Sequence, residues 1–414
     1  MNIVIFTDTF LPKIDGVGIS VDHFCRILAS RGHQFVICCP KYGKDDFHQI
    51  GDRIHIIRFK NAPLPSYPDI KIVLPSHKRI RKAMTLFQPD LVHIQTPGPL
   101  GQYGVLASRM YGVPLIGTYH TLVSEQDTYI SIYRLLKMDT LLNFFRSEKK
   151  IKKNLDKVER KKNDSIKKKV IFALCNRLYE TGAAIISPSH LIREALIKEG
   201  VRKPVEVISN GMDLSHFKGE VRQIEGPPRF LHVGRISYEK NCEVVLKAFS
   251  LIREKIPGAT LSIYGDGPAL PSLKIESRQL GIDGAVTFHG FVDRNALPEV
   301  YPRYDIFLTA STMETQGLVV LEAISCGLPC VGVNAFALPE LIHHEQNGYI
   351  VEPFDHIAMA EKAMQMVADK DLYARFSRES LNIASEHEIH HCADKLEDLY
   401  YRVSGKKREE GAAV

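Results

Sequence analysis

The chain has 414 residues, 44% of them hydrophobic and 25% charged, and its formal net charge is +6. This length exceeds what one hydrophobic core usually holds, so we expect two domains of about 200 residues each. The composition is ordinary for a soluble globular protein, and no apolar run is long enough to span a bilayer. We therefore expect any membrane contact to be peripheral. The first strand is expected to begin at Asn2, which argues against a signal peptide.

The first half of the chain alternates apolar runs with amphipathic stretches, a pattern that predicts parallel strands joined by crossover helices. We expect a helix over 18–32. The expected strands are 2–8, 34–40, 54–59, 90–96, 114–120, 183–189 and 205–211. Polar residues stand at their carboxyl ends, where ligands bind in open α/β sheets, namely Asp8, Thr96, His120, Ser187 and Asn210.

The second half repeats this organisation after an aperiodic stretch, 218–230, whose Gly-Pro-Pro suggests an interdomain linker. The expected strands are 230–235, 260–267, 285–291, 305–311 and 329–335, with a helix from Cys242. We place the first domain at 1–218, the second at 226–385, a last helix at 386–404 and a flexible tail at 405–414.

The eight cysteines form no CxxC pair and mostly fall within predicted strands or helices. This pattern predicts buried, reduced thiols and a cytoplasmic setting, not a disulfide framework or a zinc site. The cysteines are at positions 25, 38, 39, 175, 242, 326, 330 and 392.

The loop and helix after the strand at 305–311 carry two carboxylates eight positions apart, Glu314 and Glu322. They could hold the two ends of an elongated ligand, and the backbone N–H groups at the helix start, near Gly317 and Leu318, suit an anion or sugar hydroxyls. Alternatively, Glu314 caps the helix and Glu322 lies on the surface. Glu322 stands in an apolar helix, where an unpaired carboxylate is costly, and this favours the ligand site.

The segment ETQGLVVLEA at 314–323, continued by ISCGLPCV, resembles the donor-site signature of retaining glycosyltransferases of family GT4. Together with GTYHT at 117–121, it is most similar to the bacterial diacylglycerol glucosyltransferases of that family. The resemblance covers nearly the whole chain except about 130–170. It implies an α/β fold of two Rossmann-like domains facing across a cleft (GT-B), with the acceptor on the first domain, the nucleotide-sugar on the second, and the last helix returning to the first.

The resemblance also implies roles for several residues. Arg235 and Lys240 would hold the diphosphate of the donor, a task that suits a guanidinium and an ammonium, although basic loop residues are often only solvated. Glu322 would bind the ribose and Glu314 the sugar, and the backbone near Val292 would read the base. Gly317 and Leu318 complete the predicted donor site.

Two residues of the first domain have weaker signals. His120 ends a predicted strand, and a histidine there is more often structural; the resemblance places it beside the transferred sugar. Gly16, in the first loop, would let the backbone approach a phosphate, or it simply forms a turn. The preceding Asp15 departs from the family pattern and would repel a diphosphate unless Lys13 compensates.

The stretch from Lys137 to Lys169 contains thirteen Lys or Arg residues against five acids, on a background of helically spaced apolar residues. This pattern is typical of an amphipathic helix on an anionic membrane surface. A solvated helix, a coiled-coil contact or a nucleic-acid site are the alternatives, and few aromatic residues and no nucleic-acid motif favour the membrane. The predicted membrane-binding residues are Lys149, Lys150, Lys152 and Lys153.

These observations predict a retaining hexosyltransferase that moves glucose from UDP-glucose onto a membrane lipid such as diacylglycerol, with an α linkage. Arg235 and Lys240 can neutralise the diphosphate, so we expect neither a metal ion nor a cofactor. Within the same class, a GDP-mannose-dependent lipid mannosyltransferase or an enzyme with a soluble acceptor is the alternative. A membrane scaffold that binds a nucleotide-sugar without turnover, or a nucleic-acid-binding protein, would belong to a different class.

Overall fold

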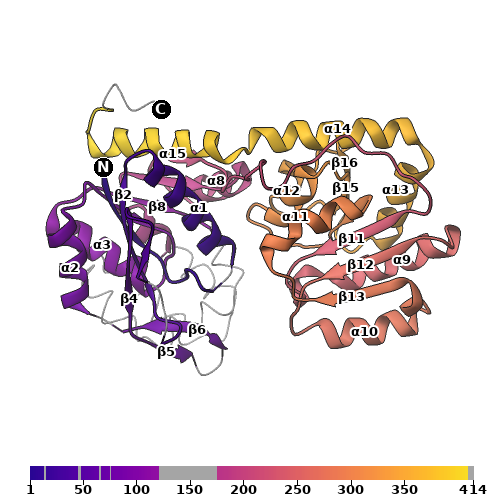
Figure 1. Ribbon diagram of the computed structural model, residues 1–414, viewed down its shortest axis with the longest axis horizontal. Coiled ribbons are helices and arrows are strands. Elements are labelled where there is room, and N and C mark those ends of the chain that lie inside the picture. The colour runs from indigo at the N-terminus through magenta and orange to yellow at the C-terminus, as the bar shows by residue number, and fades with distance from the viewer. Residues whose placement is uncertain (14, 45–47, 65–66, 75, 121–174, 409–414) are drawn as a thin grey trace. The chain divides into compact units, whose positions relative to one another are not determined.

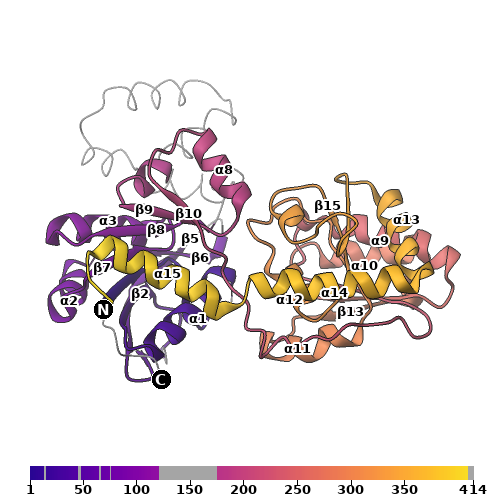
Figure 2. The ribbon, with the colours of Figure 1, turned by 90° about the horizontal axis from the view of Figure 1, so that it is seen from above.

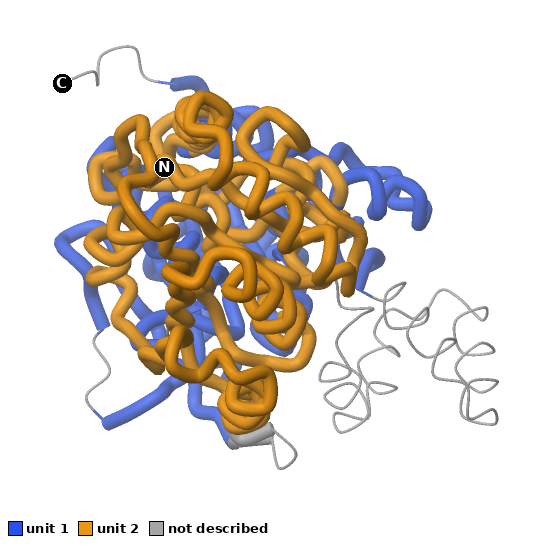
Figure 3. The backbone as a smooth tube through the Cα atoms, turned by 90° about the vertical axis from the view of Figure 1, so that its right-hand side faces the viewer, with its two compact units in different colours: residues 1–188, 192–208, 393–414 blue, residues 189–191, 209–392 orange. Residues whose placement is uncertain are grey.

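Each half of the chain builds a parallel β-sheet with helices packed on it (Figure 1). The computed structural model describes residues 1–13, 15–44, 48–64, 67–74, 76–120 and 175–408. The chain divides into two compact units: the first comprises residues 1–188, 192–208 and 393–414, and the second comprises residues 189–191 and 209–392 (Figure 3). The prediction of two Rossmann-like α/β domains is confirmed.

The first unit contains an eight-stranded sheet of order β10-β9-β8-β7-β1-β2-β4-β3, parallel except for the pair β3–β4. Its strands are β1 (Asn2–Phe6), β2 (Gln34–Pro40), β3 (Gln49–Ile50), β4 (Ile54–Phe59), β7 (Leu91–Ile94), β8 (Leu115–Thr118), β9 (Ala184–Ser187) and β10 (Val205–Val207). A separate hairpin joins β5 (Asn61–Leu64) to β6 (Tyr67–Val73). The described helices are α1 (Gly16–Ser30), α2 (His77–Phe87), α3 (Pro99–Tyr111), α8 (His190–Lys198) and α15 (Ile389–Ser404).

Successive side chains of a strand point to opposite faces of the sheet, so the apolar central strands supply both faces with apolar side chains. Ile3 and Ile5 of β1 share one core with α1 and α15. On α3, Gly104 approaches the sheet so closely that an added Cβ would lie 2.6 Å from Ile94 and 3.0 Å from Phe6. Each face is therefore covered by helices, as expected for a parallel sheet.

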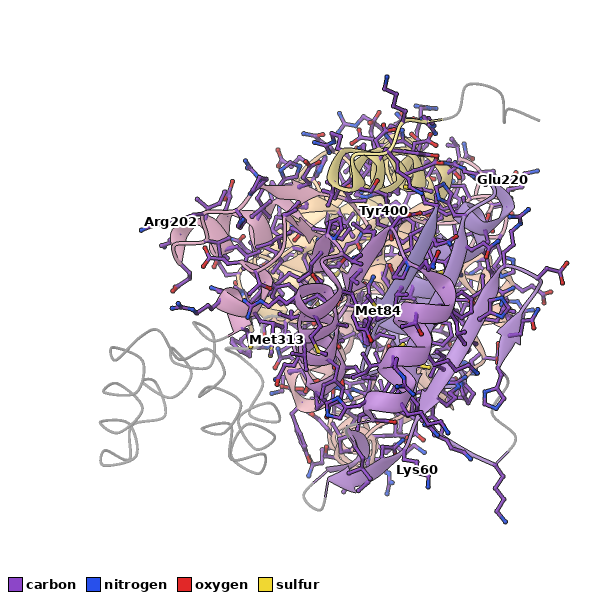
Figure 4. All side chains as sticks on the ribbon, turned by 90° about the vertical axis from the view of Figure 1, so that its left-hand side faces the viewer. Lys60, Met84, Arg202, Glu220, Met313 and Tyr400 are labelled. Atoms are coloured by element: carbon purple, nitrogen blue, oxygen red, sulfur yellow. The ribbon has the colours of Figure 1, made fainter. Side chains whose placement is uncertain are left out.

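Polar contacts also fasten α15 to the first unit, where it lies across the sheet (Figure 2). The buried Glu397 bonds His33 and Arg31, each at 2.8 Å, and the Tyr400 hydroxyl lies 2.8 Å from His93 Nδ1. Tyr400 and Met84 of α2 are both buried within this unit (Figure 4). The predicted returning helix corresponds to α15, whose residues from Ala393 onward belong to the first unit.

The second unit contains a six-stranded, wholly parallel sheet of order β13-β12-β11-β14-β15-β16. Its strands are β11 (Arg229–Val233), β12 (Thr260–Tyr264), β13 (Val286–Gly290), β14 (Ile306–Leu308), β15 (Cys330–Val333) and β16 (Gly348–Val351). Its main helices are α9 (Cys242–Lys255), α10 (Leu270–Gln279), α11 (Leu297–Val300), α12 (Leu318–Ser325), α13 (His356–Ala368) and α14 (Lys370–Glu386). The five strands expected in this half are present, and β16 is an additional one.

The boundary between the units falls earlier than the sequence suggests. Residues 209–218, expected in the first domain, belong to the second unit, because Met212 and Phe217 pack into its core. Ile224, inside the expected linker, is also buried there. The Gly-Pro-Pro stretch therefore leads into β11 within the second unit.

All eight cysteines are buried and free, which confirms their predicted burial. Among the described residues, no helix combines the length and the apolar character needed to cross a bilayer.

Candidate active site

The loop between β14 and α12 carries Glu314, which pairs with Lys240. Glu314 Oε1 lies 2.5 Å from Lys240 Nζ, and the two side chains are only 15% and 19% exposed. Lys240 ends a short 3-10 helix, Tyr238–Lys240, that follows β11, and β11 and β14 are parallel neighbours. Both residues therefore lie beyond the carboxyl ends of adjacent strands, where α/β sheets bind ligands. The structure brings these two predicted residues into direct contact.

Side chains from neighbouring segments hold this loop in place. Asn241, in the left-handed conformation at φ 48°, donates from Nδ2 to the Ala310 carbonyl at 3.1 Å and to the Thr312 hydroxyl at 3.2 Å. Next to Glu314, the buried Gln316 accepts two bonds from Asn210, from its backbone N–H at 3.1 Å and its side-chain amide at 2.6 Å. Glu314 is thus presented by a loop fixed on both sides.

Gly317 ends the loop and precedes α12. Its φ of +87° lies in the left-handed region, where glycine is favoured, and its carbonyl accepts the first helical bonds from Val320 and Leu321. The N–H groups of Leu318 and Val319 precede these bonds and have no acceptor within the helix. Gly317 and Leu318 therefore lie where the sequence predicted an anion-accepting helix start.

Arg235 is largely exposed and pairs with another carboxylate, Glu239. Its guanidinium Nη2 is 3.2 Å from Glu239 Oε1, and its side chain is 71% exposed. The backbone around it is tightly built, since a Cβ on Gly265 would lie 1.8 Å from the Gly234 carbonyl oxygen. Arg235 is thus an exposed cation on a close-packed loop.

Glu322 is neither on the surface nor unpaired. It is 3% exposed within α12, where its Oε1 accepts a bond from Arg294 Nε at 3.0 Å and its Oε2 accepts one from the Tyr301 hydroxyl at 2.8 Å. Burial raises the pKa of its carboxyl, and the charge of Arg294 and the two hydrogen bonds oppose that rise. These two partners offset the free-energy cost of burying a carboxylate in an apolar helix.

The segment predicted to read the base, residues 289–292, lies at the end of β13, the edge strand. Gly290 has φ +73°, Phe291 is 66% exposed, and Val292 is half-buried against the core of the unit. One residue earlier, the ring of His289 stacks on Tyr264, with ring centroids 4.0 Å apart. This segment therefore presents an exposed aromatic ring beside a backbone turn.

His120 lies two residues beyond β8 in the first unit and belongs to a buried polar network. Its Nε2 is 2.7 Å from Gln95 Oε1, and the Gln95 amide nitrogen lies 3.1 Å from His93 Nε2. His93 in turn contacts Thr118 at 2.7 Å and Tyr400 at 2.8 Å. Burial lowers the pKa of His120 to about 4, and burial with the neighbouring His120 lowers the pKa of His93 to about 3. Both imidazoles are therefore neutral near pH 7.

Gly16 is the first residue of α1, directly after the N-cap residue Asp15. Asp15 accepts a bond from the Gly18 N–H at 2.9 Å and a short bond from the Thr9 hydroxyl, and it lies 3.7 Å from Lys13 Nζ. The departure from the family pattern thus has a structural role, because Asp15 caps the helix and Lys13 partly offsets its charge.

Among the predicted site residues, Gly16, predicted to bind the donor, and His120 belong to the first unit, and the other predicted donor-site residues belong to the second. The four predicted membrane-binding residues, Lys149, Lys150, Lys152 and Lys153, lie outside the described part of the chain. Within the described part, no three His, Cys, Asp or Glu side chains are grouped so that they could hold a metal ion.

Several side chains that support the predicted residues were not predicted. Gln95 precedes Thr96 at a strand end that the sequence did mark as polar, so its position was a usable signal. Arg294 and Tyr301 had only an indirect signal, the need of Glu322 for partners. Asn241 had none, because its contacts depend on the tertiary approach of two loops.

Comparison with known proteins agrees with this architecture. The family model described as Glycosyltransferase Family 4 matches residues 14–216, and the one described as Glycosyl transferases group 1 matches residues 216–382. The chain belongs to glycosyltransferase family 4. It is therefore a glycosyltransferase.

Among the relatives of this family-4 chain, the alpha-monoglucosyldiacylglycerol synthase of Streptococcus pneumoniae is 27% identical over 361 residues, which cover 84% of this chain and 74% of that protein. A GDP-mannose-dependent alpha-mannosyltransferase of Mycobacterium tuberculosis is 24% identical over 100% of this chain and 99% of its own. A solved structure of Anabaena Alr3699/HepE in complex with UDP-glucose has a TM-score of 0.71 at 20% identity, covering 97% of this chain and 100% of its own. That likeness supports the two-domain GT-B fold.

Proposed function

We propose that this glycosyltransferase moves glucose from UDP-glucose onto a membrane lipid such as diacylglycerol, with retention, to form an α-glycosidic bond. Its similarity to a protein named alpha-monoglucosyldiacylglycerol synthase, over 84% of the chain, supports the lipid acceptor. The fold shared with a protein solved in complex with UDP-glucose is compatible with the donor. The reaction would be carried out by the residues described above.

The ion pair of Lys240 with Glu314 carries this proposal. An ammonium has three donor hydrogens, so the contact with Glu314 leaves Lys240 able to bond two diphosphate oxygens. Glu314 keeps lone pairs for hydroxyls of the sugar. One partly buried pair can thus contact the diphosphate and the sugar of the same donor.

In the transfer step, the bond between the anomeric carbon and the diphosphate oxygen breaks, and its electron pair stays on the diphosphate. The acceptor hydroxyl oxygen bonds the anomeric carbon and gives up its proton to the leaving oxygen or to water. Lys240 and the exposed Arg235 would stabilise the developing negative charge, so this account needs neither a metal ion nor a cofactor.

The first unit would contribute Gly16, at a phosphate, and His120, beside the transferred sugar. The neutral His120 ring can take part in hydrogen bonds without placing a positive charge beside a carbon that gains positive character. Gln95 orients the ring through Nε2. Phe291 and Val292 of the second unit would lie at the base, and Glu322 at the ribose.

A lipid acceptor stays in the bilayer, so the enzyme must reach the membrane surface. Lys149, Lys150, Lys152 and Lys153 would supply attraction to anionic lipids, at about 1 kcal/mol for each cation close to the surface. We therefore propose a cytoplasmic enzyme, peripheral on the inner face of the cell membrane, with no nucleic-acid partner.

The full-length alignment with a GDP-mannose-dependent mannosyltransferase supports a second candidate, a GDP-mannose-dependent enzyme with a lipid or soluble acceptor. A nucleotide-release screen separates the candidates: UDP- and GDP-sugars are each incubated with the protein, with and without liposomes containing diacylglycerol. We expect UDP release from UDP-glucose that depends on the liposomes. Release of GDP from GDP-mannose alone would establish the second candidate, and donor binding without any release would indicate a scaffold.

A further inference from the structure

The surroundings of Glu322 lead to an inference that rests on the proposed role of this residue at the donor ribose. Both of its carboxylate oxygens are already engaged by the protein, Oε1 by Arg294 Nε and Oε2 by the Tyr301 hydroxyl. Each oxygen of a carboxylate has two lone pairs, so one on each remains for a ligand. A vicinal diol such as a ribose offers two hydroxyl donors to such a pair of acceptors.

Arg294 is built into the second unit as the partner of this carboxylate. Its side chain is only 17% exposed, and its guanidinium carbon lies 6.0 Å from the ring centre of Phe217. Its Nη1 is buried and has no hydrogen-bond partner among the described residues. A guanidinium desolvated to this extent is tolerated because a charged partner compensates it, and Glu322 is that partner.

The other groups near Glu322 supply no comparable charge. Tyr301 is fully buried, and burial keeps its pKa well above the usual value, so it donates a neutral hydrogen bond. Cys326 lies nearby, and burial raises the pKa of its thiol to about 12. The charge of Arg222 opposes the rise in the pKa of Cys326, and the Arg222 guanidinium donates a hydrogen bond to the Pro302 carbonyl. Arg294 is thus the cation that bonds Glu322 directly.

We propose that Arg294 is a positioning residue that keeps the buried Glu322 carboxylate charged and fixed in orientation for the ribose hydroxyls of the nucleotide-sugar. Without the guanidinium, burial favours the protonated carboxyl, which has fewer acceptor sites and whose added hydroxyl competes for a partner. Tyr301 fixes the second oxygen but supplies no charge. Arg294 would therefore determine over which pH range the ribose is recognised.

The test compares UDP with 2′,3′-dideoxy-UDP as competitive ligands, and GDP with 2′,3′-dideoxy-GDP in parallel, so that the result does not depend on the base. Hydrogen bonds to a charged group contribute more binding free energy than neutral ones. Removal of the hydroxyls should therefore weaken binding to the wild-type protein about 10- to 100-fold. In Arg294→Gln we expect this ratio to shrink to a few-fold at pH 7 and to recover as the pH is raised, because the unpaired carboxyl then ionises. Arg294→Lys, which keeps a cation, should retain most of the ratio.

Two further variants keep the test decisive. Tyr301→Phe removes one hydrogen bond to Glu322 at nearly constant shape but leaves the guanidinium in place. We expect it to lower the ratio with a weaker pH dependence than that of Arg294→Gln, and this variant remains testable if Arg294→Gln folds poorly. Arg303→Gln is the matched control, because Arg303 is 66% exposed and lies 4.0 Å from Glu299. It should leave the ratio unchanged.

The outcomes distinguish the ribose role of Glu322 from the positioning role of Arg294. If the wild-type protein binds each nucleotide and its dideoxy analogue equally, the ribose role of Glu322 is refuted together with the inference built on it. If the wild-type protein discriminates but Arg294→Gln does so equally at every pH, Arg294 has no positioning role, and the ribose assignment stands.

Discussion

Replacement of Lys240 by alanine tests the charge arrangement on which the proposed reaction depends. The ammonium lies 2.5 Å from Glu314 and is 19% exposed, so it is held in place before a donor arrives. The loss of one preorganised contact to a developing charge typically costs about 3 to 4 kcal/mol, a fall of about two to three orders of magnitude in turnover. We expect a loss of that size in kcat for Lys240→Ala, measured as UDP release at saturating UDP-glucose with diacylglycerol liposomes.

The same substitution leaves the largely buried Glu314 without its cation. A buried acceptor that loses its partner costs about 1 to 3 kcal/mol, so the thermal unfolding midpoint should fall as well. The double variant Lys240→Ala/Glu314→Ala removes the unpaired carboxylate, and it should regain stability without regaining turnover. Lys247→Ala, on the helix that follows Lys240 and with a 45% exposed side chain 3.5 Å from Glu276, is the control and should change neither quantity.

Turnover of Lys240→Ala within about threefold of wild type, which is less than 1 kcal/mol, would refute the diphosphate assignment. Recovery of turnover along with stability in the double variant would show that the pair is only structural. Arg235→Ala distinguishes the roles of the two cations. Its proposed contact with the diphosphate predicts lower turnover, and its 71% exposed side chain predicts an unchanged unfolding midpoint.

Three other variants test the rest of the account. Gln95→Glu places a carboxylate against His120 Nε2 and should raise the pKa of His120 above about 4. Turnover should then be lost as the pH falls through the raised pKa. A pH–rate profile identical to that of the wild-type protein would contradict the role of Gln95. Glu397, whose pKa is lowered by hydrogen bonds from His33 and Arg31 in spite of burial, stabilises the fold above its unfolded pKa of about 4.3 and loses that contribution as the pH falls. Glu397→Gln should therefore lower the unfolding midpoint at pH 7 and flatten its fall in acid, and an equally steep fall would exclude this contribution. Replacement of Lys149, Lys150, Lys152 and Lys153 by Glu should abolish sedimentation with anionic liposomes and lipid glucosylation while donor hydrolysis persists, and unchanged sedimentation would remove the membrane role.

The sequence predicts most of this fold because parallel strands are short apolar runs between helical stretches. Each expected strand has a counterpart, and α12 starts directly after Gly317, where the sequence predicted a helix start. The contact of Glu314 with Lys240 was also foreseeable in outline, since both follow strands whose carboxyl ends meet at one edge. Local patterns thus identify the elements and the edge that bears the site.

Features that depend on distant partners could not be predicted in this way. Glu322 meets Arg294 across 28 positions, and His93 meets Tyr400 across 307 positions, so no local pattern pairs them. The boundary between the compact units differs from the expected domain boundary for a related reason. The Gly-Pro-Pro sequence resembles a linker. Residues 209–218 belong to the second unit, and Phe217 is buried in its core, which a local sequence pattern does not reveal.

Product analysis with liposomes tests the central claim most directly. The purified protein is incubated with UDP-[14C]glucose and anionic liposomes containing diacylglycerol, and the lipid extract is separated and digested with α- and β-glucosidases. The account predicts a labelled glucosyl-diacylglycerol that only the α-glucosidase cleaves, formed with one UDP per glucose. A product cleaved by the β-enzyme, or no labelled lipid from a protein that transfers sugar readily to a soluble acceptor or from GDP-mannose, would contradict it.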